Sequence, residues 1–174
     1  MKKQLKYAIY LCGFALCVMG FLNQYSFSST ISQTIPVTVY MDGIAVEETT
    51  VTMEGKRTNY ALHDNERYTG TFAIDSMEWT TRDTQSVRIA WGGDYGHLQT
   101  IQYWDWPFSE EEDIEYYLLI SDDMTQFGLQ RTDGAFIATS PEVLALMEKH
   151  FALNNAGGAS VSDVQLIPPL EELQ

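Results

Sequence analysis

The sequence predicts an all-β domain that is preceded by an apolar N-terminal segment and followed by one helix. Three observations lead to this fold class. Apolar and polar residues alternate over many short segments. Turn-forming pairs such as Asp42-Gly43 and Asp133-Gly134 separate these segments. Apolar residues recur at helical spacing in one stretch near the C-terminus. We expect about eight strands in a mostly antiparallel meander, closed as a sandwich or as a small barrel.

The N-terminal segment, residues 1–28, has the pattern of an export signal. Lys2, Lys3 and Lys6 precede an uncharged, mostly apolar run over residues 7–22. A basic start before an apolar run directs a chain into export and leaves its N-terminus in the cytoplasm. The run is short for a transmembrane helix and close in length to a signal-peptide core. We favour a retained signal anchor, single-pass in the cell membrane, over secretion after cleavage near Ser28.

The remaining chain is expected to form one extracytoplasmic domain. Residues 29–34 are polar and predict a short tether, residues 35–153 predict the β domain with its C-terminal helix, and residues 154–174 lack periodicity and predict a flexible tail. Both cysteines, Cys12 and Cys17, lie in the apolar N-terminal run. The β domain therefore has no internal disulfide and must be stabilised by its core alone.

The first two strands are expected to form a hairpin. Val37 and Val39 alternate with polar residues before the Asp42-Gly43 turn, and residues 44–53 are rich in Val and Thr. The apolar parity shifts between Val46 and Val51, which indicates a β-bulge or a twist.

The later elements follow from the same patterns. Alternation predicts strands over residues 68–75, 85–91, 97–104, 125–130 and 135–139, and residues 115–121 are apolar on both faces, as in a central strand. Ser140 and Pro141 suit the start of a helix. The helix has one apolar stripe, which consists of Val143, Leu146, Met147, His150 and Phe151. This stripe predicts that the helix covers one face or mouth of the sheet.

The element count, eight strands and a C-terminal helix, is similar to the lipocalin layout, which would imply a pocket for an apolar ligand. The Gly-x-Trp signature of a lipocalin's first strand is absent from residues 35–53. We therefore assign the chain to no family.

The charge balance excludes nucleic acid as a partner. The chain has 24 acidic and 10 basic residues and a formal net charge of −14, so it offers no basic face for phosphates. Acidic runs at residues 110–113 and 122–123 lack the spacing of a calcium loop, and we expect them to be solvated. Neither a metal nor a cofactor is expected.

Aromatic residues crowd one part of the chain. The four tryptophans lie between residues 79 and 106, and the parity of Trp91 and Tyr103 predicts core positions for these two. Aromatic rings on a sheet surface can stack on sugar rings, although core packing is their more common role. The candidate contacts with a ligand or surface glycan are Trp104, Trp106, Tyr95 and Phe108.

Residues 54–67 form the longest irregular stretch inside the predicted domain. Lys56, Arg57 and Arg67 lie in this stretch, in an otherwise acidic body. Long loops on a rigid sheet often carry function, whereas a plain hairpin connection is the commoner case. These three residues are the candidate functional loop.

Catalysis is not expected. The chain has three histidines and matches no metalloprotease, serine hydrolase or phosphate-loop motif. We expect a non-catalytic binding or interaction module whose partner is an exported protein or a surface glycan. One alternative is a lipocalin-like carrier, with a pocket lined by Phe72, Ile74, Ile89 and Leu118. The other is a glycan hydrolase, with two carboxylates facing each other across an aromatic cleft.

Overall fold

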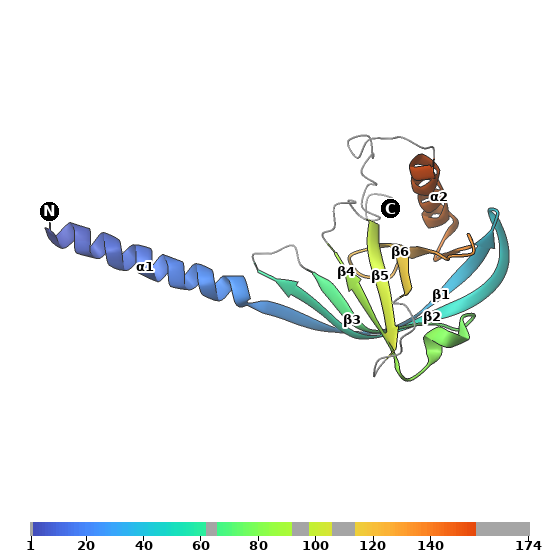
Figure 1. Ribbon diagram of the computed structural model, residues 1–174, viewed down its shortest axis with the longest axis horizontal. Coiled ribbons are helices and arrows are strands. Elements are labelled where there is room, and N and C mark those ends of the chain that lie inside the picture. The colour runs from blue at the N-terminus through green and yellow to red at the C-terminus, as the bar shows by residue number, and fades with distance from the viewer. Residues whose placement is uncertain (1, 62–65, 92–97, 106–113, 156–174) are drawn as a thin grey trace.

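The computed structural model describes residues 2–61, 66–91, 98–105 and 114–155. Each strand pairs antiparallel with the next, and β1 also pairs with β8, so the sheet closes into an eight-stranded barrel (Figure 1). The all-β fold and the C-terminal helix predicted from the sequence are confirmed, and the sheet is a barrel instead of a sandwich. The elements are α1 (Lys2–Gln24), β1 (Ser26–Met41), β2 (Ile44–Tyr60), β3 (Arg67–Ile74), the 3-10 helix η1 (Glu78–Thr81), β4 (Gln85–Ala90), β5 (Leu98–Asp105), β6 (Ile114–Ile120), β7 (Phe127–Gln130), β8 (Phe136–Ala138) and α2 (Pro141–Asn155).

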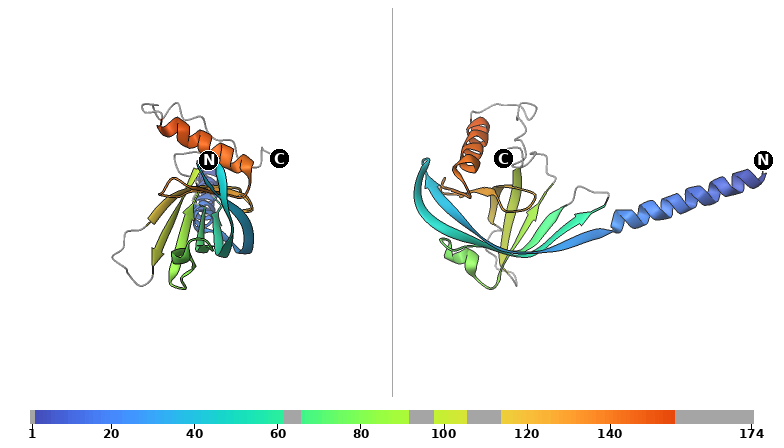
Figure 2. Two further views of the ribbon diagram at one scale, coloured as in Figure 1. Left: turned by 90° about the vertical axis from the view of Figure 1, so that its right-hand side faces the viewer. Right: turned by 180° about the vertical axis from the view of Figure 1, so that it is seen from behind.

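Helix α1 extends away from the barrel in Figures 1 and 2, and a single residue, Tyr25, separates it from β1. Large apolar side chains along α1 are exposed, among them Tyr10, Leu11 and Phe14. Within the residues that the structure describes, no helix is both long enough and apolar enough to span a membrane. The structure therefore gives no support to the predicted transmembrane span.

Strands β1 and β2 form one long hairpin. Its turn consists of Asp42 (φ 51°) and Gly43 (φ 75°), and two successive left-handed residues are typical of a tight hairpin turn. Val39 pairs with Glu47 and Tyr40 pairs with Ala45. Val46 is therefore the extra residue of a β-bulge, as the parity shift in the sequence predicted.

Two expected irregular segments belong to this hairpin. The predicted tether at residues 29–34 is part of β1, paired with β2 throughout. In the predicted loop at residues 54–67, residues 54–60 belong to β2 and Arg67 is the first residue of β3. Both interpretations of irregular structure were wrong, because these polar segments are held by backbone pairing and not by an apolar face.

Large side chains occupy the barrel interior. Phe72 and Phe127 meet edge to face, with 5.3 Å between ring centroids. The hydroxyl of Tyr103 donates a hydrogen bond of 2.9 Å to the carbonyl oxygen of Phe72. Burial raises the pKa of Tyr103 well above its usual range, with smaller contributions from Tyr116 and Tyr68. This hydroxyl is therefore a neutral, hydrogen-bonded part of the core.

The 3-10 helix η1 covers one end of the barrel. Its Trp79 packs against the core, edge to face on Tyr103 at 4.9 Å and stacked on Tyr116 at 6.3 Å. Because η1 follows β3, it lies near the end of the barrel opposite the start of that strand at Arg67.

Helix α2 packs on the outside of the barrel (Figure 2). Val143 and Met147 of its apolar stripe are buried in a second cluster with Tyr40 and Leu119. A Cβ atom at Gly128 of β7 would lie 2.7 Å from Cγ of Met147, so the missing side chain permits the close approach of the helix. The helix covers a sheet face, as predicted. The remaining stripe residues are Leu146, which is half-buried, and His150 and Phe151, whose side chains lie outside the described residues.

Candidate functional site

Four basic residues gather on three neighbouring strands at the end of the barrel opposite η1. Lys56 and Arg57 lie on β2, Arg67 on β3 and Arg88 on β4. Lys2, Lys3 and Lys6 precede the barrel, so these four are the majority of the seven basic residues that follow. The strands concentrate positive charge on one part of a strongly acidic chain.

The pairing register determines the face that each basic side chain occupies. Lys56 pairs with Thr69, and Thr69 pairs with Arg88. Paired residues share a face and successive residues alternate, so Lys56 and Arg88 share the outer face with Arg67. Arg57 pairs instead with the buried Tyr68 and belongs to the inner face. We call the surface formed by Lys56, Arg67 and Arg88 the basic face.

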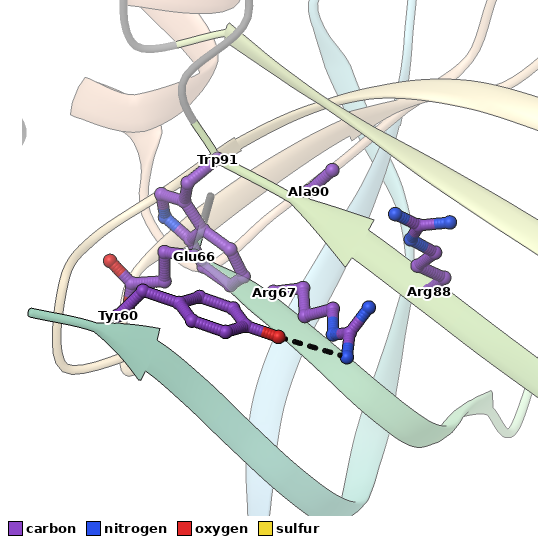
Figure 3. A pocket seen from close by; sticks show the side chains of 6 residues that line it. All are labelled: Tyr60, Glu66, Arg67, Arg88, Ala90 and Trp91. Carbon is purple, nitrogen blue, oxygen red and sulfur yellow. Dashed lines mark hydrogen bonds between the residues drawn. The ribbon is translucent and has the colours of Figure 1, made fainter. Parts of the chain in front are cut away.

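A pocket of about 170 Å³ opens beside the basic face. Arg67 and Arg88 contribute two of its walls, and Figure 3 shows Tyr60 and Trp91 at one end and Arg88 at the other. The six lining residues are Tyr60, Glu66, Arg67, Arg88, Ala90 and Trp91.

Tyr60 positions Arg67. The Nη2 atom of Arg67 donates a hydrogen bond of 3.2 Å to the Tyr60 hydroxyl, and the guanidinium carbon lies 6.0 Å from the centre of the Tyr60 ring. This distance is at the outer limit of a cation–π contact. These two contacts with Tyr60 orient the planar guanidinium group of Arg67 along the pocket wall.

Arg57 neutralises the carboxylate of the pocket. Its Nε atom pairs with Oε1 of Glu66, and its guanidinium carbon lies 5.1 Å from the centre of the Trp91 ring. The backbone N–H of Trp91 donates to the carbonyl of Glu66 at 2.9 Å, which fixes the two residues beside each other. The side chains of Arg57 and Glu66 are only 15% and 17% exposed. Their opposite charges therefore compensate each other in a largely buried part of the pocket wall.

The net charge of the pocket therefore comes from Arg67 and Arg88. Both side chains are exposed, and in the part of the chain that the structure describes neither pairs with a carboxylate. Glu54 lies on the same outer face two residues before Lys56 and marks the border of the basic face. Guanidinium groups bind carboxylates and phosphates through paired N–H donors. The pocket can accept an acidic group.

Tyr68 lies beneath this face, on the inner side of β3. It is fully buried, and its hydroxyl donates to the Thr71 carbonyl at 2.7 Å. Burial, and secondly the charge of Glu54, raise the pKa of Tyr68 above its usual range. Tyr68 therefore stays neutral and provides a packed support for the site, not a titrating group.

The structure brings together part of the residues that the sequence indicated. Lys56, Arg57 and Arg67 do converge, although from strands and not from a loop. Trp104 is half-buried on β5 and pairs with Ser86 of β4. Ser86 and Arg88 are two residues apart on β4 and lie on the same face. Trp104 therefore shares the outer face with Arg88. Tyr95, Trp106 and Phe108 lie outside the described residues.

Three site residues were missed. Arg88 lies between the buried Val87 and Ile89, so strand alternation already placed it on the outer face of β4. Tyr60 and Glu66 gave no such signal, because their roles depend on the length of β2 and on the pairing of Trp91 with the start of β3.

The carrier alternative finds no support in the core. Phe72, Ile74, Ile89 and Leu118 were expected to line a ligand pocket, and all four are buried within one contiguous cluster of core side chains. The two described pockets are lined by other residues.

Comparison with known proteins finds no matching family model, no similar curated protein and no similar solved structure. Function must therefore be argued from the site.

Proposed function

We propose that the chain is an extracytoplasmic binding module without catalytic activity, which recognises an acidic surface glycan at the basic face. One observation carries this proposal: two exposed arginines, Arg67 and Arg88, flank a pocket and lack a carboxylate partner in the described chain. The net charge of −14 repels anions at long range. Binding must therefore depend on close contacts with these guanidinium groups.

The aromatic residues around the basic face support a sugar as the carrier of the acidic group. Tyr60 and Trp91 line the pocket, and Trp104 shares the outer face with Arg88. Aromatic rings present a flat apolar surface on which a sugar ring can stack. A polysaccharide whose sugars bear carboxylates combines both features.

The state of Glu66 favours binding over catalysis. It is a carboxylate of the pocket wall, and its ion pair with Arg57 holds it. Glycoside hydrolysis commonly uses two carboxylates, and Glu66 is the single carboxylate among the six residues that line the described pocket. We propose that Glu66 shapes the pocket and does not react.

We also propose that the N-terminal segment directs the chain across the membrane and keeps it associated there. Basic residues precede an apolar run, and the exposed apolar side chains of α1 suit lipid better than water. The N-terminus would stay cytoplasmic and the barrel would lie outside. The alternative, cleavage near Ser28, would remove the first three residues of β1 from the sheet, since Ser28 pairs with Thr58.

The proposal predicts that the double variant Arg67→Gln/Arg88→Gln loses affinity for an acidic polysaccharide. Each lost charge-assisted hydrogen bond weakens binding by about 1.5–3 kcal/mol, so we expect Kd for polygalacturonate to rise at least about tenfold. Isothermal titration calorimetry of the full chain in detergent measures this change. Neutral dextran should show no binding to either protein.

The matched control is Arg82→Gln. Arg82 is exposed and follows η1, away from the pocket. Its variant should bind polygalacturonate as the natural chain does, and all variants should melt at nearly the same temperature because the substituted side chains are exposed. Unchanged binding by the double variant, or an equal loss in the control, would contradict a site at the basic face.

A further inference from the structure

Among the described residues, the edge of β1 is open over most of its length. β1 pairs with β2 from Ser26 to Met41, but it pairs with β8 only at Thr38, Val39 and Tyr40. A strand as long as β1 extends about 50 Å, whereas three residues of β8 cover about 10 Å. In the described part of the chain, no strand pairs with the second edge of β1 between residues 26 and 37.

The burial of β1 follows this pairing. Val37, Val39 and Tyr40 are buried where β8 approaches, while residues 26–36 are exposed or half-buried. Side chains of this part of β1 do reach the barrel: Nε2 of Gln33 donates to the Met124 carbonyl at 2.9 Å, and Ile31 and Ile35 pack against the core. Figures 1 and 2 show this part of β1 leaving the barrel toward α1.

This edge lacks the usual protection. Sheet edges in soluble proteins are blocked by charged residues, prolines, bulges or short strands, because free N–H and C=O groups recruit other strands. No charged residue occurs between Asn23 and Met41. Pro36 lies next to the part paired with β8, and the bulge at Val46 faces that same part. In the part of the chain that the structure describes, no second strand pairs with the stretch from Ser26 to Ile35.

We propose that residues 26–35 of β1 bind an extended segment of another exported protein, which adds a strand to the sheet. Ile31 and Ile35 pack on the core side of β1, so the segment needs apolar residues there. Ser32 and Thr34 lie on the outer side, which suits small polar residues. The net charge of −14 disfavours an acidic segment at long range, and Arg57 and Lys56 of β2 pair with Ser29 and Thr30, so a segment without charged residues in its centre suits this edge. Strand addition of this kind is a recurrent mode of peptide recognition.

A second copy of this chain fits the edge less well. Two such copies would repel each other by their net charge. Two identical edges pair symmetrically only in antiparallel orientation, and α1 continues from β1 after one residue. The two α1 helices would then point in opposite directions and could not enter one membrane. This choice of occupant rests on the proposed membrane association of α1.

Backbone hydrogen exchange tests the proposal. The probe is a synthetic peptide in which Thr and Val alternate between two terminal lysines, added to the full chain in detergent micelles. At a peptide concentration about ten times its Kd, exchange of alternate amides in residues 26–35 should slow about tenfold. The same peptide with all backbone nitrogens methylated keeps its side chains but lacks donors, and should have no effect.

Three results would overturn the inference: no slowing in residues 26–35, equal slowing by the methylated peptide, or slowing without peptide that grows with protein concentration. The last result would assign the edge to a second copy. The Arg67→Gln/Arg88→Gln variant separates this inference from the glycan proposal, since it should keep the full peptide response. If polygalacturonate does not bind at all, the peptide result still decides the role of β1.

Discussion

Thr80 shows how a single hydroxyl stabilises the connection after β3. Its side chain is 3% exposed. Its Oγ1 atom accepts the backbone N–H of Ile74 at 2.8 Å and lies 2.7 Å from the carbonyl of Met77. A buried N–H without a partner is costly, so this hydroxyl fixes η1 and the Trp79 ring that η1 presents to the core.

We predict that Thr80→Val lowers the free energy of unfolding by about 1–3 kcal/mol, because the Ile74 N–H loses its acceptor. The neighbouring Thr81 is exposed, and its hydroxyl bonds only the Glu78 carbonyl among the described residues. Thr81→Val should therefore change stability by no more than about 0.5 kcal/mol. Urea unfolding of both variants measures the difference, and equal effects would contradict the role given to Thr80.

At the same scale, strand parity identified part of the site and not the rest. Trp91 and Tyr103 were predicted to contact the core from alternation, and both do. The same alternation placed Arg88 outside, but it could not show that Arg67 lies beside it. That proximity depends on the register between β3 and β4, which is determined by pairing between distant residues. The ion pair between Arg57 and Glu66 depends in the same way on the register between β2 and β3.

At the scale of elements, two glycines allow the paired strands β2 and β3 to approach each other closely. Gly55 pairs with Gly70. A Cβ atom on Gly70 would lie 2.2 Å from the Glu54 carbonyl oxygen, and one on Gly55 would lie 2.4 Å from that of Thr69. These contacts are with backbone, which cannot move aside as a flexible side chain can. The pair therefore permits the close approach of β2 and β3 beside Lys56.

We predict that Gly70→Ala lowers the free energy of unfolding by about 1–3 kcal/mol, as overpacking does. Thr69→Ala, next to it on the exposed face, should change stability by no more than about 0.5 kcal/mol. Thermal and urea unfolding of the two variants test this. A Gly70→Ala variant as stable as the natural chain would show that the strands can separate without loss.

The full lengths of β1 and β2 could not be predicted, because parts of both strands lack apolar alternation. Residues 29–34 and 54–60 carry Ser, Thr, Gln and charged side chains with little apolar alternation. Alternation signals one buried face, and these segments are largely exposed. They are strands because each supplies the backbone partner of the other, which a sequence pattern does not record.

At the scale of the whole molecule, the barrel holds a contiguous core cluster inside, and the proposed binding site lies on its outer surface. Core side chains occupy the inside, η1 covers one end and α2 packs on the outer face near β7 and β8. The outer face of β2 to β5 carries the residues of the proposed recognition surface, Lys56, Arg67, Arg88 and Trp104. The proposed glycan site begins on β2, one strand away from the open edge of β1, because Lys56 pairs with Thr30.

The most direct measurement of the central claim is a map of amide chemical shifts during titration of the full chain with polygalacturonate. We predict that changes gather at residues 56–60, 67–69, 86–90 and 102–104, and that buried residues such as Phe72 and Leu118 stay unchanged. A parallel titration with a fatty acid should leave the same buried residues unchanged. Shifts that gather at Phe72 and Leu118, with the basic face unaffected, would show an internal ligand site and contradict the account.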